Sequence, residues 1–190
     1  MLTLRLLDAA ETCSVYETLM RKDFPPSELK GLSTILNMQR AGCYDVLGAF
    51  ESGVLIGYAM LFRPEGERLL LLDYLAVVAH LRGRGYGKAI MRLLGAYYQD
   101  GADGMMIECE RPKAAPDEGE ARARIRFYEA CGAALTSVRI WLFGVEYSIL
   151  VFPCGDSVPQ RDDWAEEMLS LYRRMLPAYL FDSQVRLIRK

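Results

Sequence analysis

The most constraining feature of this sequence is a buried strand that runs into a glycine-rich loop and then into a helix. Residues 68–79 are almost continuously apolar, which predicts a long central strand. Residues 80–87 contain three glycines, and residues 88–100 carry apolar side chains at the spacing of an amphipathic helix. This order places free backbone N–H groups and the positive end of a helix dipole at the loop. Both features favour the binding of an anion there.

The rest of the chain reads as alternating strands and helices. The helix at 88–100 is long enough to carry the chain from one strand to a parallel neighbour in a right-handed crossover. We therefore expect an α/β protein with a mixed sheet and helices on both faces. The expected strands are 2–7, 44–50, 54–62, 68–79, 105–110, 134–140 and 145–152, and the expected helices are 8–24, 27–42, 88–100, 120–131 and one that starts at 163.

Composition excludes several classes of protein. The chain has 190 residues, of which 52% are hydrophobic, so one core can be buried. Lys and Arg number 23 and Asp and Glu 25, a net charge of -2 that gives no general attraction to nucleic acid or anionic lipid. The most apolar stretch, 69–79, is shorter than the roughly 20 residues that cross a bilayer. Asp8 and Glu11 interrupt the apolar start before a signal-peptide core forms. We expect a cytoplasmic protein with no membrane or nucleic-acid partner.

The cysteine and histidine content argues against a metal site and a disulfide framework. The cysteines are odd in number, widely separated and form no C-x-x-C pair. His80 is the single histidine of the sequence, so a histidine-rich metal site is excluded and no cysteine has a histidine placed to activate it. We expect no bound metal and reduced, mostly packed thiols at Cys13, Cys43, Cys109, Cys131 and Cys154.

The loop concentrates positive charge in an otherwise acidic chain. Its sequence is Arg82-Gly83-Arg84-Gly85-Tyr86-Gly87-Lys88. The glycines let backbone approach an anion closely, and the three cations complement a di- or triphosphate. The dinucleotide pattern fails because Lys88 stands where glycine or alanine is needed. The P-loop pattern fails because Arg82 replaces a glycine and Ala89 a serine or threonine.

A third phosphate-binding pattern does fit. Arg82, Gly85 and Gly87 form R-x-x-G-x-G, which resembles the pyrophosphate-binding signature of the GNAT superfamily of acyl-CoA-dependent N-acyltransferases. Leu-Ala-Val at 75–77 and Phe-Tyr-Glu-Ala-Cys-Gly at 127–132 resemble two further family segments in the expected order. The resemblance covers residues 1–152, so we expect a GNAT-like domain there and a C-terminal helical extension, 153–190, packed on the same domain.

The resemblance implies a fold and a cofactor. The fold is a central, mostly antiparallel sheet with a splayed parallel strand pair. The cofactor is acetyl-CoA, whose pantetheine amides pair with the edge of the central strand and whose diphosphate meets the loop N–H groups. The Val77 N–H is placed to polarise the thioester carbonyl. The implied cofactor-binding residues are Leu75, Ala76, Val77, Arg82, Gly83, Arg84, Gly85, Tyr86, Gly87 and Lys88.

Two further residues receive catalytic roles. A primary amine has a pKa near about 10, so a carboxylate must remove its proton before attack. Glu108, on the strand after the loop helix, is the candidate because several family members carry a glutamate there. Glu110 shares its face of the strand and Asp73 lies on the neighbouring strand, so both remain alternatives. The family assigns protonation of the departing thiolate to the tyrosine four residues before a helix-ending glycine, here Tyr128.

We therefore expect an N-acetyltransferase that moves an acetyl group from acetyl-CoA to a primary amine of a small molecule or peptide, by direct attack in a ternary complex. The alternative is a non-catalytic acyl-CoA-binding sensor of the same fold. An acidic group favours a cationic acceptor; it comprises Glu108, Glu110, Asp117, Glu118 and Glu120. The last helix carries an apolar stripe from Trp164 to Met175. Three roles remain open for it: packing on the sheet, pairing in a homodimer, or covering the acceptor site.

Overall fold

The structure, a computed structural model, describes residues 1–188 and divides into two compact units. The first unit comprises residues 1–65 and 72–94, and the second comprises residues 66–71 and those from 95 onward. Strand β4 (Leu69–Val77) and helix α4 (Tyr86–Tyr98) contribute to both units. Each unit is described by itself below.

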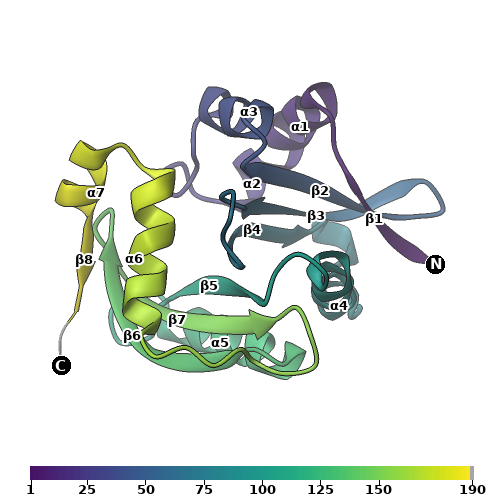
Figure 1. Ribbon diagram of the computed structural model, residues 1–190. Coiled ribbons are helices and arrows are strands. Elements are labelled where there is room, and N and C mark those ends of the chain that lie inside the picture. The colour runs from purple at the N-terminus through teal and green to yellow at the C-terminus, as the bar shows by residue number, and fades with distance from the viewer. Residues whose placement is uncertain (189–190) are drawn as a thin grey trace. The chain divides into compact units, whose positions relative to one another are not determined.

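The first unit is a twisted sheet with helices on both faces. Its strand order is β1-β2-β3-β4, in which β1 and β2 pair antiparallel, as do β2 and β3. Figure 1 shows α1 and α3 on one side of β2 and β3 and the start of α4 on the other. The remaining elements of this unit are β1 (Leu2–Leu6), α1 (Ala9–Val15), a π-helical turn (Tyr16–Met20), α2 (Arg21–Asp23), α3 (Leu32–Arg40), β2 (Tyr44–Glu51) and β3 (Val54–Phe62).

The expected start of α1 is confirmed, whereas the expected start of α3 is wrong. Asp8 and Glu11 form a reciprocal capping box. Helix α3 begins after Gly31 rather than at Ser27. The reason is Tyr74, whose hydroxyl accepts from the Lys30 N–H at 2.9 Å and donates to the Glu28 carbonyl at 2.7 Å. These backbone groups are therefore not available to an earlier helical turn.

Gly57 brings α4 close to the sheet of the first unit. A Cβ at Gly57 would lie 2.6 Å from the carbonyl oxygen of Ala76 and 2.8 Å from the Cδ1 atom of Ile90. A side chain at this position would therefore push α4 away from β3 and β4. Because α4 follows the glycine-rich loop directly, the close packing at Gly57 fixes where the loop lies against the end of β4.

The second unit is built on a continuation of the sheet. The start of β4 neighbours β5 in a parallel pair, and the order continues β5-β7-β6-β8 with antiparallel neighbours. Figure 1 shows α6 crossing in front of β6 and β7 and α5 behind them. The remaining elements are β5 (Gly104–Glu110), α5 (Glu118–Cys131), β6 (Ala134–Leu142), β7 (Val145–Pro153), α6 (Trp164–Met175), α7 (Ala178–Gln184) and β8 (Val185–Leu187).

The expected fold class, a mixed α/β protein with a mostly antiparallel sheet and one parallel pair, is confirmed. Helix α5 ends at Gly132 with φ of 107°, as the sequence indicates. Helix α4 starts two residues earlier than expected, at Tyr86. Elements α7 and β8 were not expected, because they are short and follow Pro177. Within the described residues, no helix is long and apolar enough to cross a membrane. The domain boundary at 152/153 stays a prediction.

Candidate functional site

The candidate phosphate loop lies between the end of β4 and the start of α4, in the first unit. A short 3₁₀ turn (Ala79–Leu81) leads into residues 82–85. Gly83 and Gly85 have φ of 75° and 83°, conformations that other residues adopt only with strain. No atom lies within 4 Å of where a Cβ would stand at either glycine, so both face open space.

The backbone of this loop carries unused hydrogen-bond donors. Ala89 donates to the carbonyl of Gly85 at 3.1 Å, which closes the first turn of the 13-residue helix α4. Across the described part of the chain, no protein acceptor is found for the N–H groups of residues 83–88. Consecutive free donors at a helix start, beside glycines without side chains, fit the diphosphate of acetyl-CoA.

Arg82 contacts the protein rather than open space. Its Nε atom donates to the carbonyl of Val77 at 3.0 Å, and its guanidinium pairs with Asp23, whose side chain is only 8% exposed. Asp23 also accepts from the hydroxyl of Tyr58 at 2.7 Å. Arg82 therefore ties the loop to β4 and to the end of α2, whereas Arg84 and Lys88 are exposed.

The end of β4 presents an outward row of backbone groups. Leu75 and Val77 are half-buried and Ala76 is buried between them. The N–H of Val78 donates to the carbonyl of Ile56 on β3 at 2.9 Å. Because peptide groups alternate in direction along a strand, the N–H groups of Leu75 and Val77 point away from β3. Those are the groups that the expected pairing with pantetheine requires. At the helix start, the hydroxyl of Tyr86 donates to Glu51 at 2.8 Å, which raises the pKa of Tyr86.

The two candidate glutamates lie on β5, in the second unit, and have different partners. Glu108 is half-buried and accepts a hydrogen bond from the hydroxyl of Tyr172 on α6. Glu110 lies 3.5 Å from Arg124 on α5. The sequence offered Tyr172 only as part of an apolar stripe. One sequence signal could have indicated its contact with a carboxylate: a tyrosine in an apolar stripe is expected to be buried, and a buried tyrosine hydroxyl needs a polar partner.

Asp73, the alternative base, belongs to the first unit and is already occupied. Its side chain is 6% exposed and forms an ion pair with Lys30 at 2.7 Å. It also accepts from the hydroxyl of the buried Tyr44. Burial and the neighbouring Asp73 carboxylate both raise the pKa of Tyr44, so the phenol stays protonated. Between two such partners, Asp73 serves as a structural anchor more readily than as a proton acceptor.

Tyr128 lies on α5 in the second unit and is buried. Burial raises the pKa of Tyr128 well above its ordinary value, so the hydroxyl keeps its proton over the whole range in which enzymes work. Its ring meets the edge of Phe127, with centroids 5.0 Å apart. The residues that the structure describes offer no hydrogen bond to its hydroxyl. A protonated, unengaged phenol is suited to give a proton to a leaving group.

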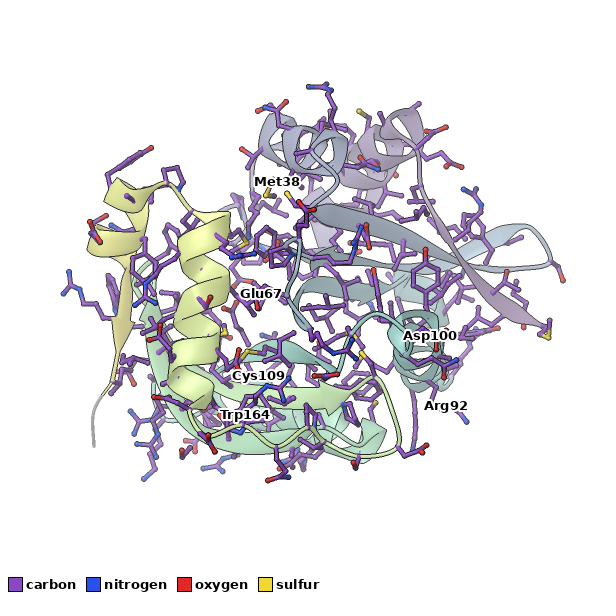
Figure 2. The ribbon with its side chains drawn as sticks, viewed as in Figure 1. Met38, Glu67, Arg92, Asp100, Cys109 and Trp164 are labelled. Atoms are coloured by element: carbon purple, nitrogen blue, oxygen red, sulfur yellow. The ribbon has the colours of Figure 1, made fainter. Side chains whose placement is uncertain are left out.

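Cys109 lies between the two candidate glutamates in the sequence of β5 and is fully buried. Its position is labelled in Figure 2. Burial raises its pKa to about 12, so the sulfur remains a neutral thiol and a poor nucleophile. The cysteines are free thiols. Residues 1–188 contain no group of three or more His, Cys, Asp or Glu side chains that could hold a metal ion.

The acidic group around α5 is largely neutralised by its own helix. Asp117 caps α5 by accepting from the N–H of Glu120 at 2.9 Å. Glu118 pairs with Arg122 at 2.5 Å, and Glu120 with Arg124 at 3.3 Å. These carboxylates therefore present little net negative charge to an acceptor, whereas Glu108 accepts a hydrogen bond from Tyr172 of α6.

Comparison with known proteins agrees with this geometry. The sequence model described as the Acetyltransferase (GNAT) family matches residues 12–133. No curated protein sequence matches the chain. Among solved structures, a protein from Bacteroides thetaiotaomicron assigned to the GNAT family is similar at 20% identity with a TM-score of 0.70, covering 87% of this chain and 92% of the other.

Two further structures share the fold at lower identity. One is the ribosomal-protein-S18-alanine N-acetyltransferase from Escherichia coli, with 17% identity, a TM-score of 0.62, and coverage of 86% of this chain and 99% of the other. The second is spermidine N-acetyltransferase from Vibrio cholerae, solved with CoA and spermine. It has 12% identity, a TM-score of 0.62, and coverage of 80% of this chain and 95% of the other.

Proposed function

Because the chain belongs to the GNAT family of acetyltransferases, we propose that it transfers the acetyl group of acetyl-CoA to a primary amine by direct attack in a ternary complex. Acetyltransferase activity and acetyl-CoA as the donor follow from the family. The acceptor, the direct route and the residues that act are our proposal. The observation that carries the proposal is the row of unpaired N–H groups at residues 83–88.

The first unit supplies the residues that hold the cofactor. In this proposal the N–H groups of 83–88 bind the diphosphate, and Arg84 and Lys88 add positive charge beside it. Arg82 acts by fixing the loop to the carbonyl of Val77 and to Asp23. The outward N–H groups of Leu75 and Val77 bind the pantetheine arm, and the N–H of Val77 stabilises the oxyanion that develops on the thioester carbonyl.

The second unit supplies the residues that move protons. Acetyl-CoA brings a thioester whose carbonyl carbon accepts an amine and whose sulfur leaves as a thiolate. Glu108 takes a proton from the ammonium form of the acceptor, since only the neutral amine has a lone pair to attack with. Tyr128 gives its proton to the departing sulfur, a role supported by its protonated state and unengaged hydroxyl. The high pKa of Cys109 argues against a cysteine-bound intermediate.

We propose a small-molecule or peptide amine as the acceptor. The similar structures include an enzyme named for the N-acetylation of an alanine of ribosomal protein S18 and one named for the N-acetylation of spermidine. The paired state of Glu118 and Glu120 removes the main argument for a strongly cationic acceptor. In this proposal the candidate base, Glu108, rather than a broad acidic surface, marks where the acceptor amine binds.

The test is a thiol-release assay with acetyl-CoA and a panel of amines: polyamines, amino sugars, aminoacyl esters and peptides with free N-termini. Calorimetric titration of acetyl-CoA runs beside it. We expect saturable binding of acetyl-CoA and release of coenzyme A with at least one amine, together with an acetylated product of the expected mass. Tight binding with no product from any class of amine would contradict the proposal and favour the non-catalytic sensor of the same fold.

A further inference from the structure

The C-terminal helix α6 places a tyrosine hydroxyl on the candidate base. Tyr172 is 3% exposed, lies on α6, and donates its hydroxyl hydrogen to the Oε1 atom of Glu108. The two residues are 64 positions apart in the chain, and both belong to the second unit. We propose that Tyr172 is a positioning residue for the acetyl transfer: it orients the Glu108 carboxylate, and α6 is therefore part of the catalytic apparatus. This inference rests on the proposed function.

Helix α6 is held in a fixed place on the second unit. Its start is capped by Asp163, whose carboxylate accepts from the N–H groups of Ala165 and Glu166. Just before the cap, Arg161 pairs with Asp103 at 2.6 Å, beside the start of β5. The apolar side chains of Met168 and Leu171 are buried, so the helix is fastened along one face as well.

A second ion pair fastens the other end of α6. Arg174, two residues after Tyr172, lies 3.4 Å from Glu67, which precedes β4 in the second unit. Figure 2 shows Glu67 beside the later turns of α6 and Trp164 at its opposite end. A helix anchored at both ends allows little rotation about its axis. The packing of α6 therefore fixes the position of the Tyr172 hydroxyl beside Glu108.

This contact has a defined chemical effect on a general base. A carboxylate offers about four acceptor positions on two oxygens, so one donor does not exhaust its capacity to accept a proton. A hydrogen bond from a phenol stabilises the charged form of the carboxylate and fixes its plane. The hydrogen bond from Tyr172 therefore favours the charged form of the half-buried Glu108 side chain and fixes the plane of its carboxylate. An arbitrary apolar side chain at position 172 would fill the same space without either effect.

The neighbours of Glu108 on β5 and β7 are engaged elsewhere or carry no polar group. Glu110, on the same strand, pairs with Arg124 of α5 at 3.5 Å. Cys109 points to the opposite face of the strand, where burial keeps it a neutral thiol. On β7, the residue opposite Glu108 is Ile149, which carries no charge or hydrogen-bonding group in its side chain. Tyr172, in contrast, donates directly to the Glu108 carboxylate.

The residues matched by the family model end at 133, and α6 begins at Trp164. The inference therefore assigns a role in the reaction to a segment beyond the matched region. It also decides among the roles that the sequence left for α6. The helix packs on the sheet through Met168 and Leu171 and in addition acts on the acceptor side through Tyr172.

The first arm of the test reads the carboxylate directly and needs no acceptor. The full-length protein is labelled with ¹³C at the glutamate side-chain carboxyl, and the Glu108 signal is assigned by its loss in Glu108→Gln. We expect Tyr172→Phe to raise the titration midpoint of that signal by about one pH unit, because a donor to the charged form has been removed. Tyr97→Phe is the matched control: the Tyr97 ring is 45% exposed and packs on Tyr98, so its hydroxyl can be lost without an effect on Glu108.

The second arm reads catalysis. With an amine from the acceptor panel, Tyr172→Phe should move the acid limb of kcat/KM upward by the same amount and leave the affinity for acetyl-CoA unchanged. In the Glu108→Gln background, Tyr172→Phe should produce no further change in the pH profile, since the carboxylate on which it acts is gone. Tyr172→Met removes the donor with nearly the same apolar volume, and it replaces Tyr172→Phe if that variant does not fold.

The possible outcomes separate the two claims. An unchanged titration midpoint in Tyr172→Phe, or an equal change of the pH profile with and without the Glu108 carboxylate, would overturn the positioning role. A shifted midpoint in a protein that acetylates no amine would overturn the proposed function while supporting the control of Glu108 by Tyr172.

Discussion

The guanidinium of Arg82 pairs with the carboxylate of Asp23 and, through Nε, donates to the carbonyl of Val77. One side chain thus joins the candidate phosphate loop, the last residue of β4 and the last residue of α2 within the first unit. Arg82 is 53% exposed, whereas Asp23 is 8% exposed. The pair therefore acts mainly by giving the buried Asp23 carboxylate a partner and by holding the loop in place, since exposed ion pairs contribute little to stability by themselves.

Arg82→Ala should lower both stability and affinity for acetyl-CoA. Removing the guanidinium leaves Asp23 with its hydrogen bond from Tyr58 but without its ion pair, at a cost of about 1–2 kcal/mol in the free energy of unfolding. Arg84→Ala is the matched control, because Arg84 is exposed and has no ion pair within residues 1–188. It should weaken acetyl-CoA binding with no change in Tm. Calorimetry and thermal melts distinguish the two, and equal melting temperatures for both variants would contradict the anchoring role of Arg82.

Gly85→Val should abolish acetyl-CoA binding, because a side chain there would cover the N–H groups that the diphosphate needs. The φ of 83° at Gly85 also makes valine strained, at about 1–3 kcal/mol. Gly42→Val controls for that strain: Gly42 has φ of 74° and open space beside it, but lies at the end of α3. Both variants should lose similar stability, and only Gly85→Val should lose binding. Retained affinity in Gly85→Val would place the phosphate elsewhere.

Glu108→Gln should reduce turnover by about 10²-fold at neutral pH and recover in part at high pH, where the acceptor amine is already neutral. Asp73→Asn should instead lower Tm, because Lys30 and Tyr44 lose the carboxylate that they share. Steady-state rates from pH 6 to 10 check the first expectation, and thermal melts check the second. A pH profile that loses its acid limb in Asp73→Asn and keeps it in Glu108→Gln would identify Asp73 as the base.

Tyr128→Phe should lower kcat by about 10²-fold or more and leave both Tm and the affinity for acetyl-CoA nearly unchanged. The ring keeps its contact with Phe127, and the hydroxyl has no partner to lose among the residues described. The proton is needed only as the C–S bond breaks, so the loss belongs to the transition state. The measurement is steady-state kinetics at saturating acetyl-CoA. Equal kcat values for the Tyr128→Phe variant and the unaltered protein would show that Tyr128 serves only in packing.

Features set by neighbouring residues could be predicted from the sequence. The helix start at Asp8 and Glu11, the adjacent strands expected at 44–50 and 54–62, and the helix end at Gly132 all depend on a few neighbouring residues. The glycine loop belongs to the same class, since its chemistry follows from a strand, glycines and a helix start in immediate succession. Such features can be predicted from the sequence because tertiary structure changes them little.

Contacts between distant segments could not be predicted. The pairs Tyr172–Glu108 and Lys30–Asp73 join residues 64 and 43 positions apart, and neither has a local pattern. The expected start of α3 is wrong for the same reason, since the hydroxyl of Tyr74, on β4, forms hydrogen bonds with backbone groups of residues 28 and 30. Arg82 is one of three cations in the loop sequence, and no local pattern reveals its partner Asp23, which lies 59 positions away. Each of these contacts depends on which partner a polar group finds after the chain has folded.

The account depends above all on the loop at 82–88 binding acetyl-CoA. Titration of acetyl-CoA into the protein in a calorimeter, with NAD as the comparison ligand, tests this most directly. We predict saturable binding of one acetyl-CoA per chain, a rise in Tm that follows from mass action, and no heat or Tm shift with NAD. Binding of NAD with none of acetyl-CoA would contradict the account.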